Sequence, residues 1–233
     1  LTVVADASGD DGAGGFAWMA GAPAVAVVVS ERWPDDVRAA LAASADEREA
    51  QLRRCGSTGA QPFLPTAAAE LFTQLLVARV AGRHFGEPQR IYGVCDCASA
   101  VRALDELHGR SPHMAAVARR VAGSGWAWVG VHVPREFNVD ADRLSHPHLL
   151  DAVMREAADA GVRAVRVRAD ESDWALLRAA IVEAGSATGK RRRRQAVRTA
   201  PAGRRIGVGR LRREPGPWDR PHRVWLAAAQ AQA

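Results

Sequence analysis

Three short strands are predicted at the start of the chain, where residues 1–29 read LTVVADASGDDGAGGFAWMAGAPAVAVVV. Apolar and β-branched residues fall in three runs, at 1–8, 14–20 and 24–29. Turn-forming residues separate the runs, namely Gly9-Asp10-Asp11-Gly12 and then Gly21-Ala22-Pro23. Short apolar runs on short loops are typical of a meander of neighbouring strands.

Helices and strands alternate beyond this meander. The spacing of Leu71, Leu75 and Val80 predicts a helix that opens at Pro65-Thr66 and runs to about Ala81. Further helices are expected at 36–54, 98–108, 112–122 and from about 138, and further strands at 91–95 and 126–133. A meander followed by such an alternation predicts an α/β fold with a five-stranded mixed sheet flanked by helices.

The chain divides into three parts by composition. Residues 1–146 contain the predicted sheet. Residues 147–185 are expected to form a small appendage, with amphipathic helices at 149–160 and 174–184 around a strand-like segment. Residues 186–233 are rich in Arg, Gly, Pro and Ala without periodicity, and we expect them to be a disordered tail.

The formal net charge of +6 is unevenly distributed. Residues 186–233 contain Lys190 and twelve arginines against Glu214 and Asp219, an excess of eleven positive charges, so the remainder of the chain carries −5. Clustered guanidinium groups bind nucleic-acid phosphates by releasing condensed counterions. The alternative is a solvated tail that has no partner.

Composition excludes several classes of protein. With 233 residues, 48% hydrophobic and 25% charged, the chain can bury its own core and is unlike a collagen, a coiled coil or a mini-protein. No apolar run reaches the length of a bilayer span, and the segment from Leu1 lacks the features of a signal peptide. Cys55, Cys95 and Cys97 are odd in number and lack zinc spacing, which favours a reducing intracellular location, nuclear or cytoplasmic.

Two aspartates mark the ends of apolar strands. Asp6 lies within the first run, among small and apolar neighbours, and Asp96 directly follows the strand at 91–95. The predicted topology places these two strands side by side. Each aspartate alone could be a turn residue at a strand end. An unpaired carboxylate buried inside a strand would instead cost free energy of folding.

Two further carboxylates lie in predicted helices. Glu70 misses the capping-box position by one residue if Thr66 is the N-cap. Asn138 is the expected N-cap of the last predicted helix of this part. Asp142 lies two residues after Asp140 in that helix, farther from its N-terminus. A favourable charge near a helix N-terminus is the alternative role for either residue.

Several carboxylates brought together would stay protonated unless a cation joined them. Mg²⁺ prefers oxygen ligands, and two such ions about 4 Å apart stabilise the attacking and leaving oxygens of a phosphoryl displacement. The sequence therefore predicts a magnesium-dependent reaction at a phosphodiester.

In the order of its motifs the sequence resembles a type 1 ribonuclease H domain of the kind found in retroelement reverse transcriptases. The resemblance covers roughly residues 1–146. It is carried by Val4-Ala5-Asp6-Ala7-Ser8 with Gly14-Gly15, by Ala69-Glu70-Leu71, by Val94-Cys95-Asp96-Cys97 with Ala100, and by residues 133–145, VPREFNVDADRLS.

The resemblance implies a five-stranded mixed sheet with helices and a reaction on the RNA strand of an RNA–DNA hybrid. It makes Asp6, Glu70, Asp96 and Asp142 the catalytic, metal-binding set, with two Mg²⁺ ions or Mn²⁺ in their place. Asp6 and Asp96 would bind or bridge the ions, Glu70 would hold the ion nearer the attacking water, and Asp142 would complete the second site. The products would carry a 3′-hydroxyl and a 5′-phosphate.

The sequence departs from this family at two places. The position of the loop histidine that assists product release falls on Arg135, and the segment from Glu31 to Leu64 is longer than expected. Two alternatives stay open: a DNA-directed nuclease or integrase-like enzyme, and a non-catalytic remnant that binds nucleic acid. We expect Cys95 and Cys97 to be small core residues.

Overall fold

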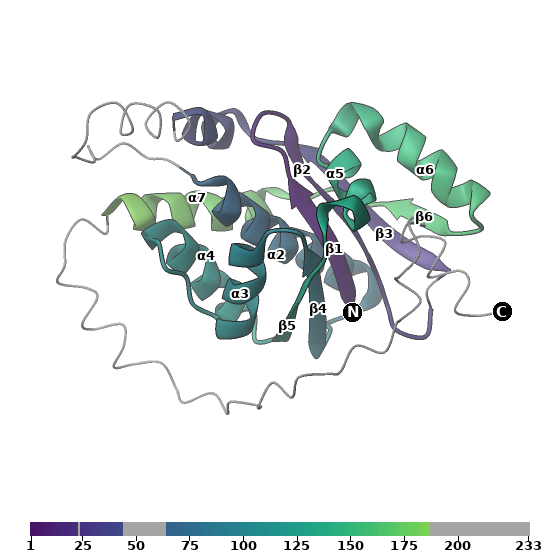
Figure 1. The fold of residues 1–233 in the computed structure, drawn as a ribbon, viewed down its shortest axis with the longest axis horizontal. Coiled ribbons are helices and arrows are strands. Elements are labelled where there is room, and N and C mark those ends of the chain that lie inside the picture. The colour runs from purple at the N-terminus through teal and green to yellow at the C-terminus, as the bar shows by residue number, and fades with distance from the viewer. Residues whose placement is uncertain (23, 44–63, 187–233) are drawn as a thin grey trace.

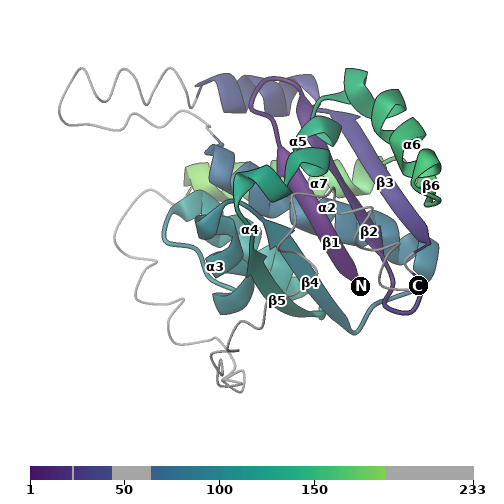
Figure 2. The same cartoon turned by 45° about the vertical axis from the view of Figure 1, so that its right-hand side comes forward.

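The computed structural model describes residues 1–22, 24–43 and 64–186. Within these ranges the chain forms an α/β fold with a six-stranded mixed sheet in the order β5-β4-β1-β2-β3-β6 (Figures 1 and 2). The strands are β1 (Thr2–Ala7), β2 (Gly12–Trp18), β3 (Val25–Arg32), β4 (Arg90–Cys95), β5 (Ala127–His132) and β6 (Arg163–Arg166). The α-helices are residues 35–43, α2 (Thr66–Phe85), α3 (Ala98–Glu106), α4 (Pro112–Gly123), α5 (Val139–Leu144), α6 (Leu150–Asp159) and α7 (Glu171–Ser186).

The predicted meander and the alternation after it are confirmed. Strands β1, β2 and β3 pair antiparallel, and β4 pairs parallel with both β1 and β5. The two strands that lead to Asp6 and Asp96 are therefore neighbours, as expected. Of the helix expected at 36–54, residues 35–43 are helical, while the rest of it and the Arg-rich tail lie outside the described residues.

The expectation of five strands is wrong, because β6 adds a sixth. It pairs parallel with β3, from Val25 opposite Arg163 to Val28 opposite Arg166. The segment expected as an appendage thus extends the same sheet. This strand spans four residues and has an arginine at each end, so its sequence carries a weak strand signal. Short, charged strands are usual at sheet edges, where they discourage pairing with another chain.

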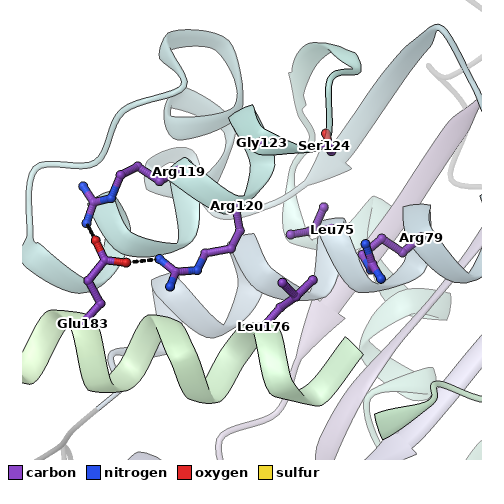
Figure 3. A pocket seen from close by; sticks show the side chains of 8 residues that line it. All are labelled: Leu75, Arg79, Arg119, Arg120, Gly123, Ser124, Leu176 and Glu183. Atoms are coloured by element: carbon purple, nitrogen blue, oxygen red, sulfur yellow. Dashed lines mark hydrogen bonds and ion pairs between the residues drawn. The ribbon is translucent and has the colours of Figure 1, made fainter. Parts of the chain in front are cut away.

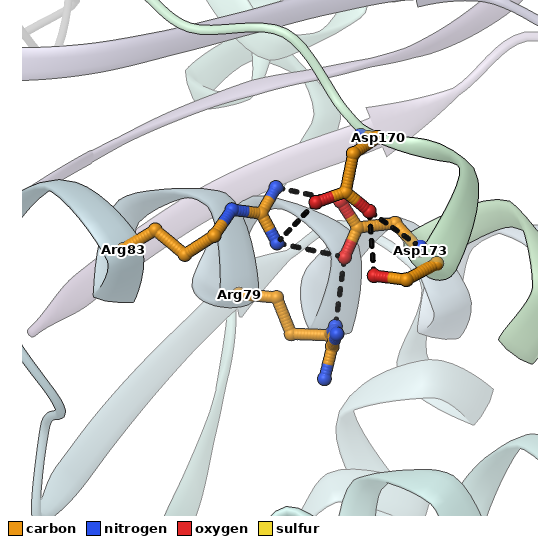
Figure 4. Close-up of polar contacts among 5 residues, drawn as sticks. Arg79, Arg83, Asp170 and Asp173 are labelled. Atoms are coloured by element: carbon orange, nitrogen blue, oxygen red, sulfur yellow. Dashed lines mark hydrogen bonds and ion pairs between the residues drawn. The ribbon is translucent and has the colours of Figure 1, made fainter.

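Helix α7 belongs to the main core. Its Trp174, Leu177 and Ile181 are buried in the same apolar cluster as α2. The Asp173 carboxylate, with no exposed surface, accepts hydrogen bonds from Arg79 Nε at 2.8 Å and from both terminal nitrogens of Arg83 at 3.0 and 2.6 Å (Figure 4). Two guanidinium partners offset the cost of burying this charge, so α7 is fixed against α2.

The two faces of the sheet carry separate cores. Val3, Ala5 and Ala7 of β1 pack in the cluster formed with α2, α3, α4 and α7, whereas Val4 packs with residues of α5 and α6. Alternation along the strand puts Asp6 on the face of Val4, toward α5. On that face β4 and β5 expose Tyr92 and Val129, so these two side chains reach solvent. Among the described residues, no helix has the length and apolar character needed to cross a membrane.

Gly14 lets α5 lie directly against β2. In the sheet register Gly14 is opposite Asp6, and a Cβ at Gly14 would be 2.1 Å from the backbone carbonyl of Leu144. The Ser30 hydroxyl donates to that same carbonyl oxygen at 2.6 Å. The missing side chain and this hydrogen bond together hold α5, and with it Asp142, next to β1.

We expect Gly14→Ala to destabilise the protein by about 3 kcal/mol, because the added methyl collides with backbone that cannot move without displacing α5. Gly9→Ala is the control, since nothing lies within 4 Å of a Cβ there. Urea unfolding of both variants measures the difference. A loss in Gly14→Ala no greater than in Gly9→Ala would contradict this account of α5.

Candidate metal centre

Four elements bring the four predicted carboxylates together. Asp6 lies near the end of β1, Glu70 in the first half of α2, Asp96 directly after β4, and Asp142 in α5. Burial, and then the negative charges of Glu70, Asp96 and Asp142, raise the pKa of Asp6 to about 7. The side chains of these four residues therefore form one electrostatic group, which we call the carboxylate cluster.

Glu70 is the member of the cluster with the most varied surroundings. Burial raises its pKa and the charge of Asp96 adds to this effect, while hydrogen bonds from the thiols of Cys97 and Cys95 oppose it. The Cys95 Sγ lies 3.7 Å from Glu70 Oε2. One potential ligand atom each from Glu70, Cys95 and Asp96 lie within 4.8 Å of one another. Cys95 is a core residue, as expected, but its thiol also contacts the cluster.

A buried glutamine positions the elements that carry Asp6, Glu70 and Asp96. The pairing of β1 with β4 ends at Val4 opposite Val94. Just beyond this point, Gln74 Nε2 donates to the backbone carbonyls of Ala5 at 3.1 Å and Val94 at 2.7 Å. Gln74 lies one helical turn after Glu70 on α2. The two hydrogen bonds of Gln74 therefore hold Glu70 near the point where β1 and β4 separate.

A hydrogen bond also joins the start of helix α5 to the carboxylate cluster. The Asn138 amide donates to Asp96 Oδ1 at 3.3 Å, and Ser145 Oγ donates to the Asp142 carbonyl at 2.7 Å. Arg143 forms two hydrogen bonds to Glu156, at 2.7 and 3.1 Å, that join α5 to α6. The first contact joins the start of α5 to the residue after β4, and the last pair joins α5 to α6.

Two capping expectations need correction. Pro65, not Thr66, is the N-cap residue of α2, so Glu70 lies two positions past the capping-box residue. Asn138 does occupy the N-cap position of α5, but its side chain makes no capping hydrogen bond and reaches Asp96 instead. Both findings weaken the purely helical roles considered for these acidic residues.

One cationic side chain stands at the rim of the cluster. Arg135 Nη2 lies 3.6 Å from Asp142 Oδ1, its side chain is 83% exposed, and its charge lowers the pKa of Glu70. The ring of His132, three residues before Arg135, has Nε2 at 3.0 Å from the Asp96 carbonyl oxygen. Arg135 can therefore meet an anion from solvent beside its contact with Asp142, whereas His132 contacts the backbone at Asp96.

The chemistry of this donor set fits a hard divalent cation. Carboxylate oxygens dominate the cluster, and a cation among them would remove the repulsion that raises the pKa of Asp6. Gln74 was not singled out in the sequence, although it is the amide in the otherwise mostly apolar run LFTQLLVA at 71–78. The role of Asn138 beyond capping and the thiol contacts to Glu70 were also missed, and neither has a local sequence signal.

A separate pocket lies between α2, α4 and α7 and shares no residue with the cluster (Figure 3). Arg119 and Arg120 of α4 point into it, and both pair with Glu183 of α7. Their charges are used to join the two helices. Two tryptophans of the β5 region lie outside both sites: Trp128 is buried, and Trp126 Nε1 donates to Glu87 at 2.9 Å.

Comparison of the chain with protein-family models, with curated protein sequences and with solved structures finds no match in any of the three.

We expect Gln74→Leu to lower the free energy of unfolding by about 1–3 kcal/mol, because two buried carbonyl oxygens lose their donor. It should also weaken Mg²⁺ binding, since Glu70 loses its support. Thr73→Val is the matched control, because the Thr73 hydroxyl donates only to Ala69 within α2. Urea unfolding and calorimetric Mg²⁺ titration measure both effects, and equal behaviour of the two variants would refute the bridge.

The raised pKa of Asp6 predicts a pH dependence of stability. The carboxyl of Asp6 in the folded, metal-free protein has a pKa of about 7 and holds its proton up to that pH, whereas the unfolded chain releases it near 3.8, the ordinary pKa of an aspartate. The free energy of unfolding should therefore fall as the pH rises from about 4 to about 7.

Asp6→Asn removes this penalty, and we expect it to stabilise the metal-free protein at pH 8 by about 4 kcal/mol. The stabilising effect should vanish below pH 4. Thermal unfolding in the presence of a chelator tests this, with Asp10→Asn in the exposed β1–β2 turn as the control. A metal-free Asp6→Asn protein less stable than the wild type at pH 8 would contradict the repulsion described.

Proposed function

We propose that the protein is a metal-dependent nuclease with a ribonuclease H-like fold that cleaves the RNA strand of RNA–DNA hybrids. The observation that carries this proposal is the convergence of Asp6, Glu70, Asp96 and Asp142 from β1, α2, the end of β4 and α5. The order of these residues along the chain, and the strand or helix that carries each one, are those that the family resemblance implies.

The carboxylate cluster would hold two Mg²⁺ ions, for which Mn²⁺ is a substitute. Bound there, the ions would supply an activated water and neutralise charge on the attacking and leaving oxygens. Asp6, whose pKa responds to the charges of the other three carboxylates, would contact the ions from β1. Glu70 and Asp96 would serve one side of the cluster and Asp142 the other.

Arg135 is the residue best placed to contact the nucleic acid itself. Its guanidinium is exposed and lies 3.6 Å from Asp142, so it can pair with a phosphate beside the metal ions. By the resemblance, Arg135 occupies the position at which the family carries its loop histidine. On the same face of the sheet as Asp6, the exposed side chains of Tyr92 and Val129 would be available to contact a duplex.

Choice of RNA would follow from the 2′-hydroxyls that flank the scissile phosphate, since these distinguish the two strands of a hybrid. Because residues 1–185 carry a formal charge of −5, general attraction for the phosphate backbone would come from the Arg-rich tail. The tail would raise affinity without adding sequence preference.

The test compares an RNA–DNA hybrid, a DNA duplex and an RNA duplex, each incubated with the full chain and Mg²⁺. We expect cleavage of the RNA strand of the hybrid, with 3′-hydroxyl and 5′-phosphate ends. Asp96→Asn should lower the rate by about 100-fold or more through loss of a metal ligand. Asp35→Asn, whose side chain is 93% exposed on the helix at residues 35–43, should cleave as the wild type does.

Two outcomes would point to the alternatives. Preferential cutting of the DNA duplex would identify a DNA-directed nuclease. Binding of the hybrid with equal residual cleavage in the wild type and in Asp96→Asn would leave a nucleic-acid-binding protein without catalysis.

A further inference from the structure

We propose that Cys95, Cys97, Glu70 and Asp96 form a thiolate–carboxylate site that takes Zn²⁺ and related thiophilic cations. A Zn²⁺ ion held there would use the carboxylates of Glu70 and Asp96 and so exclude Mg²⁺ from the carboxylate cluster. Binding of Zn²⁺ depends only on these four side chains. Its inhibitory effect rests on the proposed function.

The spacing of the ligand atoms fits a tetrahedral ion. Zn–S and Zn–O bonds of about 2.3 and 2.0 Å at a tetrahedral angle separate sulfur from oxygen by about 3.5 Å. The Cys95 Sγ and Glu70 Oε2 are 3.7 Å apart. A ligand oxygen of Asp96 lies within 4.8 Å of both atoms. Three of four ligands are therefore in place or within a small side-chain movement of their places.

Cys97 supplies the fourth donor. Its thiol is hydrogen-bonded to the Glu70 carboxylate, the same group that the Cys95 thiol contacts. The Cys97 backbone N–H also donates to the Cys95 Sγ at 3.3 Å. This donor orients the Cys95 sulfur, as contacts outside the ligands do in metal sites. Burial and the charge of Glu70 raise the pKa of both thiols, so the bond to the metal must itself displace the two protons.

This site was missed in the sequence because only one residue separates Cys95 from Cys97, and no other ligand pair follows at zinc spacing. The structure completes the set with Glu70, which lies on another element, and with Asp96, which lies between the two cysteines. Cys95 is buried, whereas Cys97, Glu70 and Asp96 are each partly exposed. A cation can therefore enter from the side of Cys97 and Asp96.

Ligand chemistry separates the two kinds of cation. Mg²⁺ requires oxygen ligands in octahedral geometry, and thiolate sulfur favours Zn²⁺. On binding Zn²⁺, the thiols of Cys95 and Cys97 each release one proton to solvent as each sulfur forms a bond to the metal. Because both cations need Glu70 and Asp96, they compete for the same carboxylates.

The binding test uses Co²⁺ as a spectroscopic substitute for Zn²⁺ in the full chain carrying Cys55→Ser, so that any thiolate signal comes from the other two cysteines. We expect a sulfur-to-cobalt charge-transfer band together with tetrahedral ligand-field bands, and Zn²⁺ should abolish both. Adding Cys97→Ser should weaken binding by about 10–100-fold. Adding Cys95→Ser as well should remove the charge-transfer band.

Circular dichroism checks that each variant is folded, and Cys97→Ser is the safer change because Cys97 is only partly buried. Absence of the band in folded Cys55→Ser protein would overturn the proposal. So would a band that persists when all three cysteines are replaced.

The inhibition test adds Zn²⁺ to the Mg²⁺-dependent cleavage reaction and compares its potency, relative to each protein's own activity, in Cys55→Ser and in Cys55→Ser/Cys97→Ser. We expect the second protein to need about 10–100-fold more Zn²⁺. Equal potency would overturn the proposal.

The two proposals fail separately. A thiolate band without any cleavage would refute the nuclease and leave the zinc site, whereas cleavage without the band would do the reverse.

Discussion

The side-chain amide of Gln74 joins α2 to the ends of β1 and β4, and the geometry of the carboxylate cluster depends on this bridge. Its two N–H groups reach the carbonyls of Ala5 and Val94, just after the pairing of the two strands ends. Asp6 follows one of these carbonyls directly, and Glu70 lies one turn earlier on the helix. One buried hydrogen-bonding group thus fixes three acidic side chains contributed by segments far apart in the sequence.

This arrangement costs stability when no cation is bound. Burial of the Asp6 carboxyl, and then the negative charges of three neighbouring carboxylates, raise the pKa of Asp6 to about 7. Interactions elsewhere in the fold, such as Asp173 between Arg79 and Arg83, hold the surrounding helices in place against this repulsion. The thiols beside Glu70 add a second type of donor at one end of the cluster. The same carboxylates can therefore serve a hard cation or a thiophilic one.

Much of the fold could be predicted because local patterns specify it. The meander of β1 to β3, the helix that carries Glu70 and the strand before Asp96 all follow from apolar spacing and turn residues. The sequence indicates a strand-like segment where β6 lies, but its pairing with β3 could not be predicted, because RAVR is short and tertiary packing decides its partner. The four carboxylates were found through the order of their motifs. The contacts that position them, from Gln74, Asn138 and the two thiols, depend on which face of each element meets its neighbour, and no local pattern reports that.

A crystal structure of the full chain with Mn²⁺, using the anomalous signal of manganese, tests the central claim most directly. The account predicts anomalous peaks among the carboxylates of Asp6, Glu70, Asp96 and Asp142, and their loss in crystals of Asp6→Asn. Manganese bound elsewhere, or the four carboxylates pointing to separate surfaces, would contradict it.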